Sequence, residues 1–196
     1  MLRALLYCVV ALVSLIALAN VPASAQSETP EPAVSNKPKG MVLLTIGGYV
    51  GKPNRGPFDP TRDSALAKLK VEFKNGFEFD REMLLALPQG TVTATTPELE
   101  GEAVFKGPEL REVLGFIEAA KVKTRFVASD GYSGYLLPED IDASDYILAL
   151  EADGKPLGLN GQGPLWLMST RKPGESVGAD NRGSRVWALV YMHIGE

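Results

Sequence analysis

The sequence predicts an α+β domain in which a few short helices pack on a mixed or antiparallel β-sheet. Stretches rich in alternating apolar residues recur between Gly-containing turns, which is typical of strands. Only residues 81–88 and 108–120 carry a clear helical pattern. Strands and helices do not alternate regularly, as they would in a parallel α/β sheet, so we expect about seven to nine strands and two or three short helices.

The first 25 residues have the features of a secretory signal peptide. Arg3 precedes an apolar run from Ala4 to Ala19, and Ala23-Ser24-Ala25 is an A-x-A cleavage pattern. The alternative is an uncleaved anchor, because the run approaches the length that spans a bilayer. Residues 26–40 place prolines among polar residues and are expected to form a flexible tether. Residues 41–196 are long enough for a single domain.

Composition narrows the kinds of site that the domain can hold. Cys8 is the only cysteine and leaves with the signal, so the mature chain has no disulfide and no thiolate. An exported chain of this kind is typical of a bacterial periplasm. His193 is the only histidine; in its apolar strand we expect it to be structural, with proton transfer as the alternative. Removing Arg3 changes the net charge from −4 to −5, and without a basic cluster the chain has no electrostatic footprint for nucleic acid.

The elements are expected in a definite order. Residues 41–50 (MVLLTIGGYV) predict a strand, and 51–64 a long loop rich in Gly and Pro. Residues 69–80 alternate about Asn75-Gly76, which predicts a strand with a tight turn. Asp80 is expected to cap the helix over 81–88, and apolar residues at i, i+3, i+4 and i+7 from Leu110 give the helix over 108–120 an apolar face. Further strands are expected within residues 91–95, 102–107, 124–129, 130–138, 146–157, 163–170 and 185–194.

Polar and aromatic side chains at the turns suggest a binding site. A flat heterocycle with adjacent N–H donors is bound by a carboxylate that accepts two bonds, by hydroxyls at its edge and by an aromatic face. The alternatives are an ordinary turn at Asp130-Gly131 and core packing for Trp166. The residues that offer these groups are Thr95, Thr96, Glu98, Asp130, Tyr132 and Trp166.

A run of spaced residues begins at Thr95: Thr95-Thr96-Pro97 is followed by Gly101, Phe105, Gly107, Leu110-Arg111 and Leu114. This run resembles the pattern T-T-P-W-x-x-G-x-x-x-F-x-G-x-x-L-R-x-x-L of small bacterial proteins with the molybdopterin-binding fold of the sulfite oxidase family. The resemblance implies an α+β domain with a mixed sheet and a pterin pocket. It continues in order through Asp130-Gly131-Tyr132, Leu148-Ala149, Asp153-Gly154-Lys155-Pro156-Leu157, Gly163-Pro164-Leu165-Trp166 and Val186-Trp187.

Departures from the family pattern bear on function. Catalytic members coordinate molybdenum through a Cys in the loop after the strand that corresponds to residues 91–95, and this chain has only hydroxyls and carboxylates there. A thiolate is the soft anionic ligand that fixes such a metal. Trp166 stands where those enzymes carry a phosphate-binding Arg, which suits an aromatic ring better than a pyrophosphate tail. Glu98 stands where close relatives have Trp.

The resemblance implies a non-catalytic periplasmic pterin-binding protein. Such proteins report to a membrane-bound enzyme that makes or degrades cyclic di-GMP, and so influence biofilm formation. In this interpretation the ligand is a pterin, molybdenum is not expected, and the partner is the periplasmic part of a membrane signalling protein. The alternatives are a molybdopterin-dependent oxidoreductase that holds its metal without Cys, and an interaction scaffold with a vestigial pocket.

The resemblance also implies roles for individual residues. A carboxylate is expected to pair with the ring N–H and amino groups, an aromatic ring to stack on the pterin, and hydroxyls to contact its edge. Arg185 is expected to meet a side-chain hydroxyl or a phosphate of the ligand. The carboxylates are Asp130 or Glu98, the rings Tyr132 or Trp166, and the hydroxyls Thr95 and Thr96.

Overall fold

Three β-sheets organise the computed structural model, which describes residues 36–97, 99, 101–170 and 185–195. Within these ranges there are eleven strands and four short α-helices, more than the seven to nine strands and two or three helices expected, and the α+β class is confirmed. The predicted signal peptide and most of the predicted tether lie outside the described residues. None of the described helices is long and apolar enough to cross a membrane.

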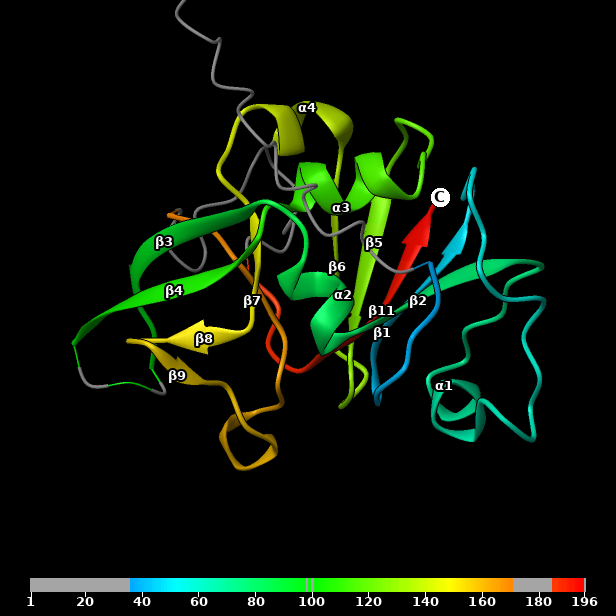
Figure 1. Cartoon of the computed structure of the whole chain (residues 1–196), viewed down its shortest axis with the longest axis horizontal. Helices are drawn as coiled ribbons and strands as arrows, with labels where there is room; N and C mark the ends of the chain where they lie inside the picture. The colour runs from blue at the N-terminus through cyan, green and yellow to red at the C-terminus, as the bar shows by residue number, and fades with distance from the viewer. Residues whose placement is uncertain (1–35, 98, 100, 171–184, 196) are drawn as a thin grey trace, which may run out of the picture. The chain divides into compact units, whose positions relative to one another are not determined.

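The largest sheet has five strands and mixed directions (Figure 1). Its central pair, β1 and β11, is parallel, and the other neighbours in the sheet are antiparallel. The first and last described strands therefore lie side by side, as the parallel register of Thr45 with Tyr191 shows. In spatial order the strands are β2 (Gly76–Asp80), β1 (Val42–Gly48), β11 (Leu189–Ile194), β5 (Thr124–Ala128) and β6 (Ser133–Leu136).

A four-stranded antiparallel sheet and a two-stranded ribbon complete the β-structure. The β3–β4 hairpin pairs over its full length, from Gln89 opposite Pro108 to Thr95 opposite Glu102. Gly107 is required at its base, because a Cβ there would collide with the Leu148 carbonyl of the ribbon. The sheet comprises β3 (Gln89–Thr95), β4 (Glu102–Pro108), β8 (Glu151–Ala152) and β9 (Lys155–Pro156); the ribbon comprises β7 (Ile147–Ala149) and β10 (Trp166–Met168).

The helices are short, and side chains fix the ends of α2. The Asp80 carboxylate accepts a hydrogen bond from the Met83 N–H at 2.9 Å, which confirms the predicted N-cap. After the last turn of α2, the Gln89 side-chain amide donates to the carbonyls of Leu84 and Leu87. The helices are α1 (Ser64–Lys68), α2 (Arg81–Leu85), α3 (Leu110–Phe116) and α4 (Pro138–Asp142), with a 3₁₀ turn η1 at Leu159–Gly161.

The β10 segment is buried on both faces and separates two apolar clusters. Leu167 and its bridge partner Val186 belong to the larger cluster, which lies under the five-stranded sheet together with residues of α2 and α3. Trp166 and Met168 belong to the second cluster, against β3 and β4. Because successive side chains of a strand point to opposite faces, this one strand contributes to both clusters.

Two predicted elements need correction. Residues 69–75 form no strand, and only residues 76–80 pair with β1. The apolar alternation there has another cause: Val71 and Phe73 pack with Tyr191 on the outer face of the five-stranded sheet. The helix predicted over 108–120 is shorter than expected. It begins at Leu110, because Pro108 is the last residue of β4, and it ends at Phe116.

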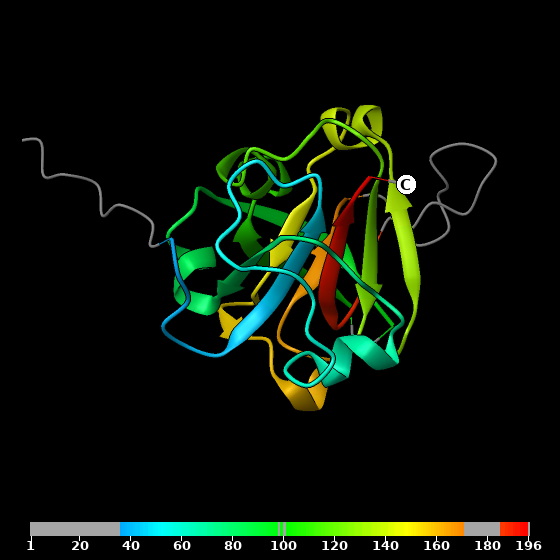
Figure 2. The same ribbon diagram turned by 90° about the vertical axis from the view of Figure 1, so that its right-hand side faces the viewer.

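The Gly- and Pro-rich segment before α1 is held to the sheet by a buried arginine (Figure 2 shows it on the near side of the strands). Arg55 bonds Asp63 at 2.7 Å and Glu78 at 2.8 Å, and its guanidinium lies 4.7 Å from the centre of the Phe73 ring. The hydrogen bonds from Arg55 hold the pKa of the Asp63 carboxyl below its usual range. The predicted loop is thus an ordered segment with an ionic centre.

Candidate functional site

A pocket of about 480 Å³ lies at the end of β5. Its walls come from three separate segments: the turn between β5 and β6, the end of η1, and the residues before β11. We refer to it as the Asp130 pocket. It is lined by Ala128, Ser129, Asp130, Tyr132, Gln162, Trp187 and Ala188.

The turn between β5 and β6 presents Asp130 and Tyr132 to this pocket. One carboxylate oxygen of Asp130 accepts from the Tyr132 N–H at 2.9 Å, and Gly131 supplies the positive φ of 92° that the turn needs. The second carboxylate oxygen of Asp130 has no hydrogen bond to any described residue. The Tyr132 side chain is 45% exposed. Asp130 is therefore a turn residue, which was the alternative to a binding role, and it also lines the pocket.

The opposite wall depends on a close approach between Gly163 and Ala188. A Cβ at Gly163, whose φ is 85°, would lie 2.9 Å from the Ala188 Cα atom. The Trp166 indole N–H donates to the carbonyls of Gln162 at 3.1 Å and Gly163 at 3.2 Å. Trp166 is 2% exposed and so supports this wall from behind.

Two tryptophans connect the pocket with the second apolar cluster. Trp187 lines the pocket and meets Trp166 edge-on, with ring centres 6.2 Å apart. The Trp187 indole nitrogen is buried and has no hydrogen-bond partner among the described residues. Since Trp166 is enclosed, the rings that line the pocket are those of Tyr132 and Trp187.

A second group of predicted residues gathers where β3 ends. The Arg185 guanidinium, 4% exposed, donates to the carbonyls of Thr95 at 2.8 Å and Ser169 at 3.2 Å. Thr95 thus contributes its backbone, and its side chain is exposed. Thr96 is 3% exposed, and its hydroxyl has no hydrogen-bond partner among the described residues. An unpaired buried hydroxyl costs free energy, so its presence needs a reason other than stability.

The structure divides the predicted site residues into two groups. Asp130 and Tyr132 share the pocket, while Thr95, Thr96 and Arg185 meet at the end of β3. The groups are linked along the chain, because Arg185 and Trp187 flank Val186, which bridges Leu167 of β10. Glu98 lies outside the described residues.

Sequence reasoning missed Trp187 and Gln162 as pocket residues. Trp187 was noted as part of the Val186-Trp187 motif and not as a site residue, and its position two residues after Arg185 was the available signal. No sequence pattern marked Gln162 as a pocket residue. It lies at the pocket because its backbone, directly after η1, is left-handed with φ 65°.

These residues fit a pterin ring better than the molybdenum centre that the fold family implies. Asp130 offers a free acceptor to ring N–H groups, and Tyr132 and Trp187 offer aromatic faces to a flat heterocycle. After β3, where the resemblance places the metal-binding Cys, the chain offers only hydroxyls and carboxylates, which are not soft ligands. Across the described ranges, no group of three or more His, Cys, Asp or Glu is placed to hold a metal ion.

Comparison with known proteins identifies the fold. No protein-family model matches the chain, and no curated protein matches it. Among solved structures, the sulfane dehydrogenase SoxCD from Paracoccus pantotrophus is similar, with a TM-score of 0.50 at 18% sequence identity. The likeness covers 83% of this chain and 40% of that chain, so the present chain spans about two fifths of its length. At this identity the likeness shows the fold alone: the chain has the α+β, sulfite oxidase-like molybdopterin-binding fold predicted from its sequence.

Proposed function

We propose that this domain is a non-catalytic pterin-binding protein with its ligand in the Asp130 pocket. The observation that carries the proposal is the composition of that pocket, which combines a carboxylate, a phenol ring and an indole from segments far apart in sequence. Ligand sites of this kind are concave, with aromatic walls and few polar groups that fix orientation. The fold, which is that of molybdopterin-binding domains, supports the same ligand class.

The binding mode follows from the groups that line the pocket. The unpaired oxygen of Asp130 accepts from the ring N–H or the exocyclic amino group of the pterin, while its other oxygen keeps the turn in place. Tyr132 stacks on the ring, because it is the exposed aromatic side chain of the pocket. Gln162 and Ser129 contact the edge of the ring.

The residues at the end of β3 support a binding role rather than catalysis. Catalytic members of the family that the sequence resembles hold molybdenum through a thiolate in the loop after this strand, and this chain has only hydroxyls and carboxylates there. Arg185 is engaged by the carbonyls of Thr95 and Ser169, so it stabilises this corner of the fold. Bound pterin would then act as a signal.

The resemblance to small periplasmic proteins supports a wider role. We propose that the protein is exported to the periplasm and relays its ligand state to a membrane-bound cyclic di-GMP enzyme. Tyr132 stands at an exposed turn, where a partner protein would sense whether the pocket is filled. Fractionation of cells that express the full chain, with immunodetection of a C-terminal tag, tests the location. Affinity capture with and without pterin tests the partner.

The direct test is a titration of the purified mature protein with tetrahydrobiopterin under anaerobic conditions, followed by calorimetry. Asp130→Asn keeps the side-chain oxygen that the turn uses and removes the charge, and it should weaken binding about tenfold, as expected for a lost charge-assisted hydrogen bond. Asp153→Asn is the matched control, because Asp153 forms the other Asp-Gly turn and does not line the pocket. Equal affinities of the two variants would contradict the proposal.

Tryptophan variants and metal analysis separate the proposal from its alternatives. Trp187→Phe should weaken pterin binding, because Trp187 lines the pocket, whereas Trp166→Phe should change affinity only slightly. Molybdenum near one atom per chain in protein isolated from the periplasm would instead support the oxidoreductase. Protein that carries no pterin and binds none would support the scaffold.

A further inference from the structure

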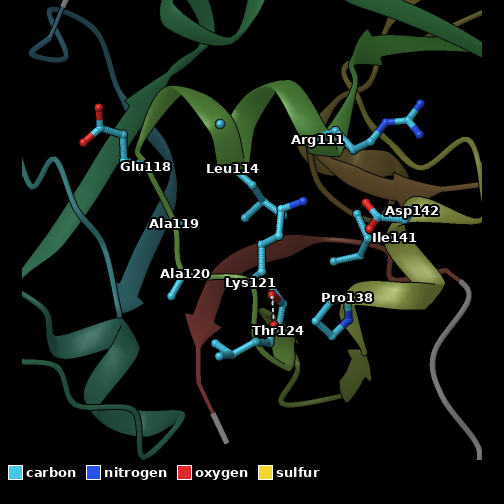
Figure 3. A pocket seen from close by; sticks show the side chains of 12 residues that line it. Arg111, Leu114, Glu118, Ala119, Ala120, Lys121, Thr124, Pro138, Ile141 and Asp142 are labelled. Atoms are coloured by element: carbon cyan, nitrogen blue, oxygen red, sulfur yellow. Dashed lines mark hydrogen bonds between the residues drawn. The ribbon is translucent and has the colours of Figure 1, made fainter.

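A second cavity lies at the other end of β5 from the Asp130 pocket. It has a volume of about 230 Å³ and opens between α3 and α4 (Figure 3). Thr124, the first residue of β5, lines this cavity, whereas Ala128, the last, lines the Asp130 pocket. We refer to it as the α3–α4 pocket.

The walls of the α3–α4 pocket are largely apolar. Leu114 of α3, Val122 of the following loop and Ile141 of α4 contribute branched side chains, and Pro138 closes the end near β5. The loop after α3 adds the small residues Ala119 and Ala120, which leave space that larger side chains would fill. A hollow of this chemistry accepts an apolar group from outside.

Gly115 lines the α3–α4 pocket and contributes no side chain to it. It lies in the last turn of α3 and does not have the positive φ that would require glycine. A Cβ at this position would meet no atom within 4 Å, so no neighbour demands its absence. Glycine weakens a helix relative to alanine. The observable consequence of glycine here is the open space at the rim of the cavity.

Of the four charged side chains that line the pocket, two have an ion-pair partner and two have none among the described residues. Glu118 bonds Lys52 at 2.8 Å, and Arg111 lies 3.5 Å from Glu109. Lys121 and Asp142 have no ion pair with any described residue. Figure 3 shows the Lys121 side chain extending across the pocket toward Leu114, with Asp142 at the α4 side. The ammonium group of Lys121 is therefore placed beside the apolar walls, where the head of an amphiphile would lie.

We propose that the α3–α4 pocket binds a small amphiphilic anion. Its apolar body fills the space between Leu114, Val122 and Ile141, and its anionic head pairs with Lys121. The volume limits the body to the size of a small aromatic system or a short acyl chain. Asp142 opposes this head, so the two charges affect affinity in opposite directions. The proposal is independent of the pterin site, which lies beyond the far end of β5.

The fluorescent probe 8-anilinonaphthalene-1-sulfonate, an aromatic body with one sulfonate, tests the proposal at pH 7, with octanoate as competitor. Lys121→Gln should weaken probe binding about threefold and Asp142→Asn should tighten it by a similar factor, as expected for exposed charge pairs. Gly115→Leu should abolish binding by filling the mouth. Glu112→Leu adds the same side chain to α3 at an exposed position outside the pocket and should leave binding unchanged.

Thermal unfolding of each variant confirms that the fold is retained, and Asp130→Asn should bind the probe like the wild type. Lack of probe binding to the wild-type protein would overturn the proposal, as would unchanged binding to folded Gly115→Leu. Reversed effects of Lys121→Gln and Asp142→Asn would show that the head group is cationic and would overturn it too. Binding that octanoate does not displace would show that the probe lies elsewhere.

Discussion

At the scale of single residues, the Asp80 carboxylate accepts more backbone hydrogen bonds than an N-cap residue needs to. Its Oδ2 accepts from the N–H groups of Lys39 at 2.6 Å and Gly40 at 2.8 Å, and its Oδ1 accepts from Met83. Burial raises the pKa of the Asp80 carboxyl, but the hydrogen bonds from Gly40, Met83 and Lys39 outweigh this effect and the pKa lies below its usual value. Asp80 therefore ties the chain entering β1 to the start of α2.

This lowered pKa predicts a pH dependence. Because the carboxyl binds a proton more weakly in the folded than in the unfolded state, its contribution to stability is complete above the unfolded pKa near 4 and is lost as pH falls through the folded pKa. Asp80→Asn should lower the free energy of unfolding by about 2 kcal/mol at pH 7. Urea unfolding at pH 7 and below pH 4 measures both effects, and the exposed Asp153→Asn serves as control. A constant difference between wild type and Asp80→Asn at all pH values would contradict the assignment.

Substitution of Thr96, in contrast to Asp80, is expected to raise the free energy of unfolding. Its buried hydroxyl has no partner among the described residues, so Thr96→Val should raise the free energy of unfolding by about 1 kcal/mol. Thr124→Val is the matched control, because the equally buried Thr124 hydroxyl donates to the Val122 carbonyl over 3.4 Å, and the loss of this long bond should cost up to about 1 kcal/mol. Urea unfolding without ligand compares them. A destabilised Thr96→Val variant would mean that the hydroxyl supports the fold.

At the scale of elements, the ordered segment before α1 depends on Arg55. The side chains of Arg55, Asp63 and Glu78 are between 4% and 9% exposed, so removal of the guanidinium leaves two buried carboxylates without their shared partner. Arg55→Met should cost about 3–5 kcal/mol. Arg62→Met removes an arginine that also bonds Glu78 but is 55% exposed, and it should cost at most about 1 kcal/mol. Chemical denaturation distinguishes the two, and equal costs would refute a buried ionic centre.

The elements show what local sequence can and cannot predict. The α2 helix and the strands β3 and β4 were predicted because a capping Asp and regular alternation are local signals, whereas the pairing of β3 with β4 was not predicted. The α1 and α4 helices were missed because five residues are too few for a helical period to be visible. Residues 69–75 were assigned to a strand because packing of Val71 and Phe73 on a sheet face produces the same alternation as pairing within a sheet.

At the scale of the whole molecule, the fluorescence of both tryptophans reports on the second apolar cluster. Trp166 and Trp187 pack in the second apolar cluster, whereas far-UV circular dichroism reports on all the strands. Because β10 contributes side chains to both clusters, we expect them to unfold together. Tryptophan fluorescence and circular dichroism should therefore give the same urea midpoint. An earlier midpoint by fluorescence would show that the layer of β3 and β4 opens separately.

Two residues that line the candidate site could be predicted from the sequence, but the way the site residues are arranged in space could not. Asp130 and Tyr132 were identified because a turn between strands places its side chains at a sheet end. The separation of this pair from Thr95, Thr96 and Arg185 depends on how the two sheets pack on the β7–β10 ribbon, which no local pattern encodes. The burial of Trp166 and the partial exposure of Trp187 are set by the same packing.

The parallel pairing of β1 with β11 has a consequence for how the chain reaches its native state. The centre of the main sheet joins the first described strand to the last, so β1 and β5 have no common neighbour until residues 189–194 have been delivered. Contacts between positions so distant in sequence slow folding. If the chain is threaded through a membrane from its N-terminus, as we propose, the sheet would be completed only after residues 189–194 have crossed. Until then β1 and β5 would lack the strand that joins them.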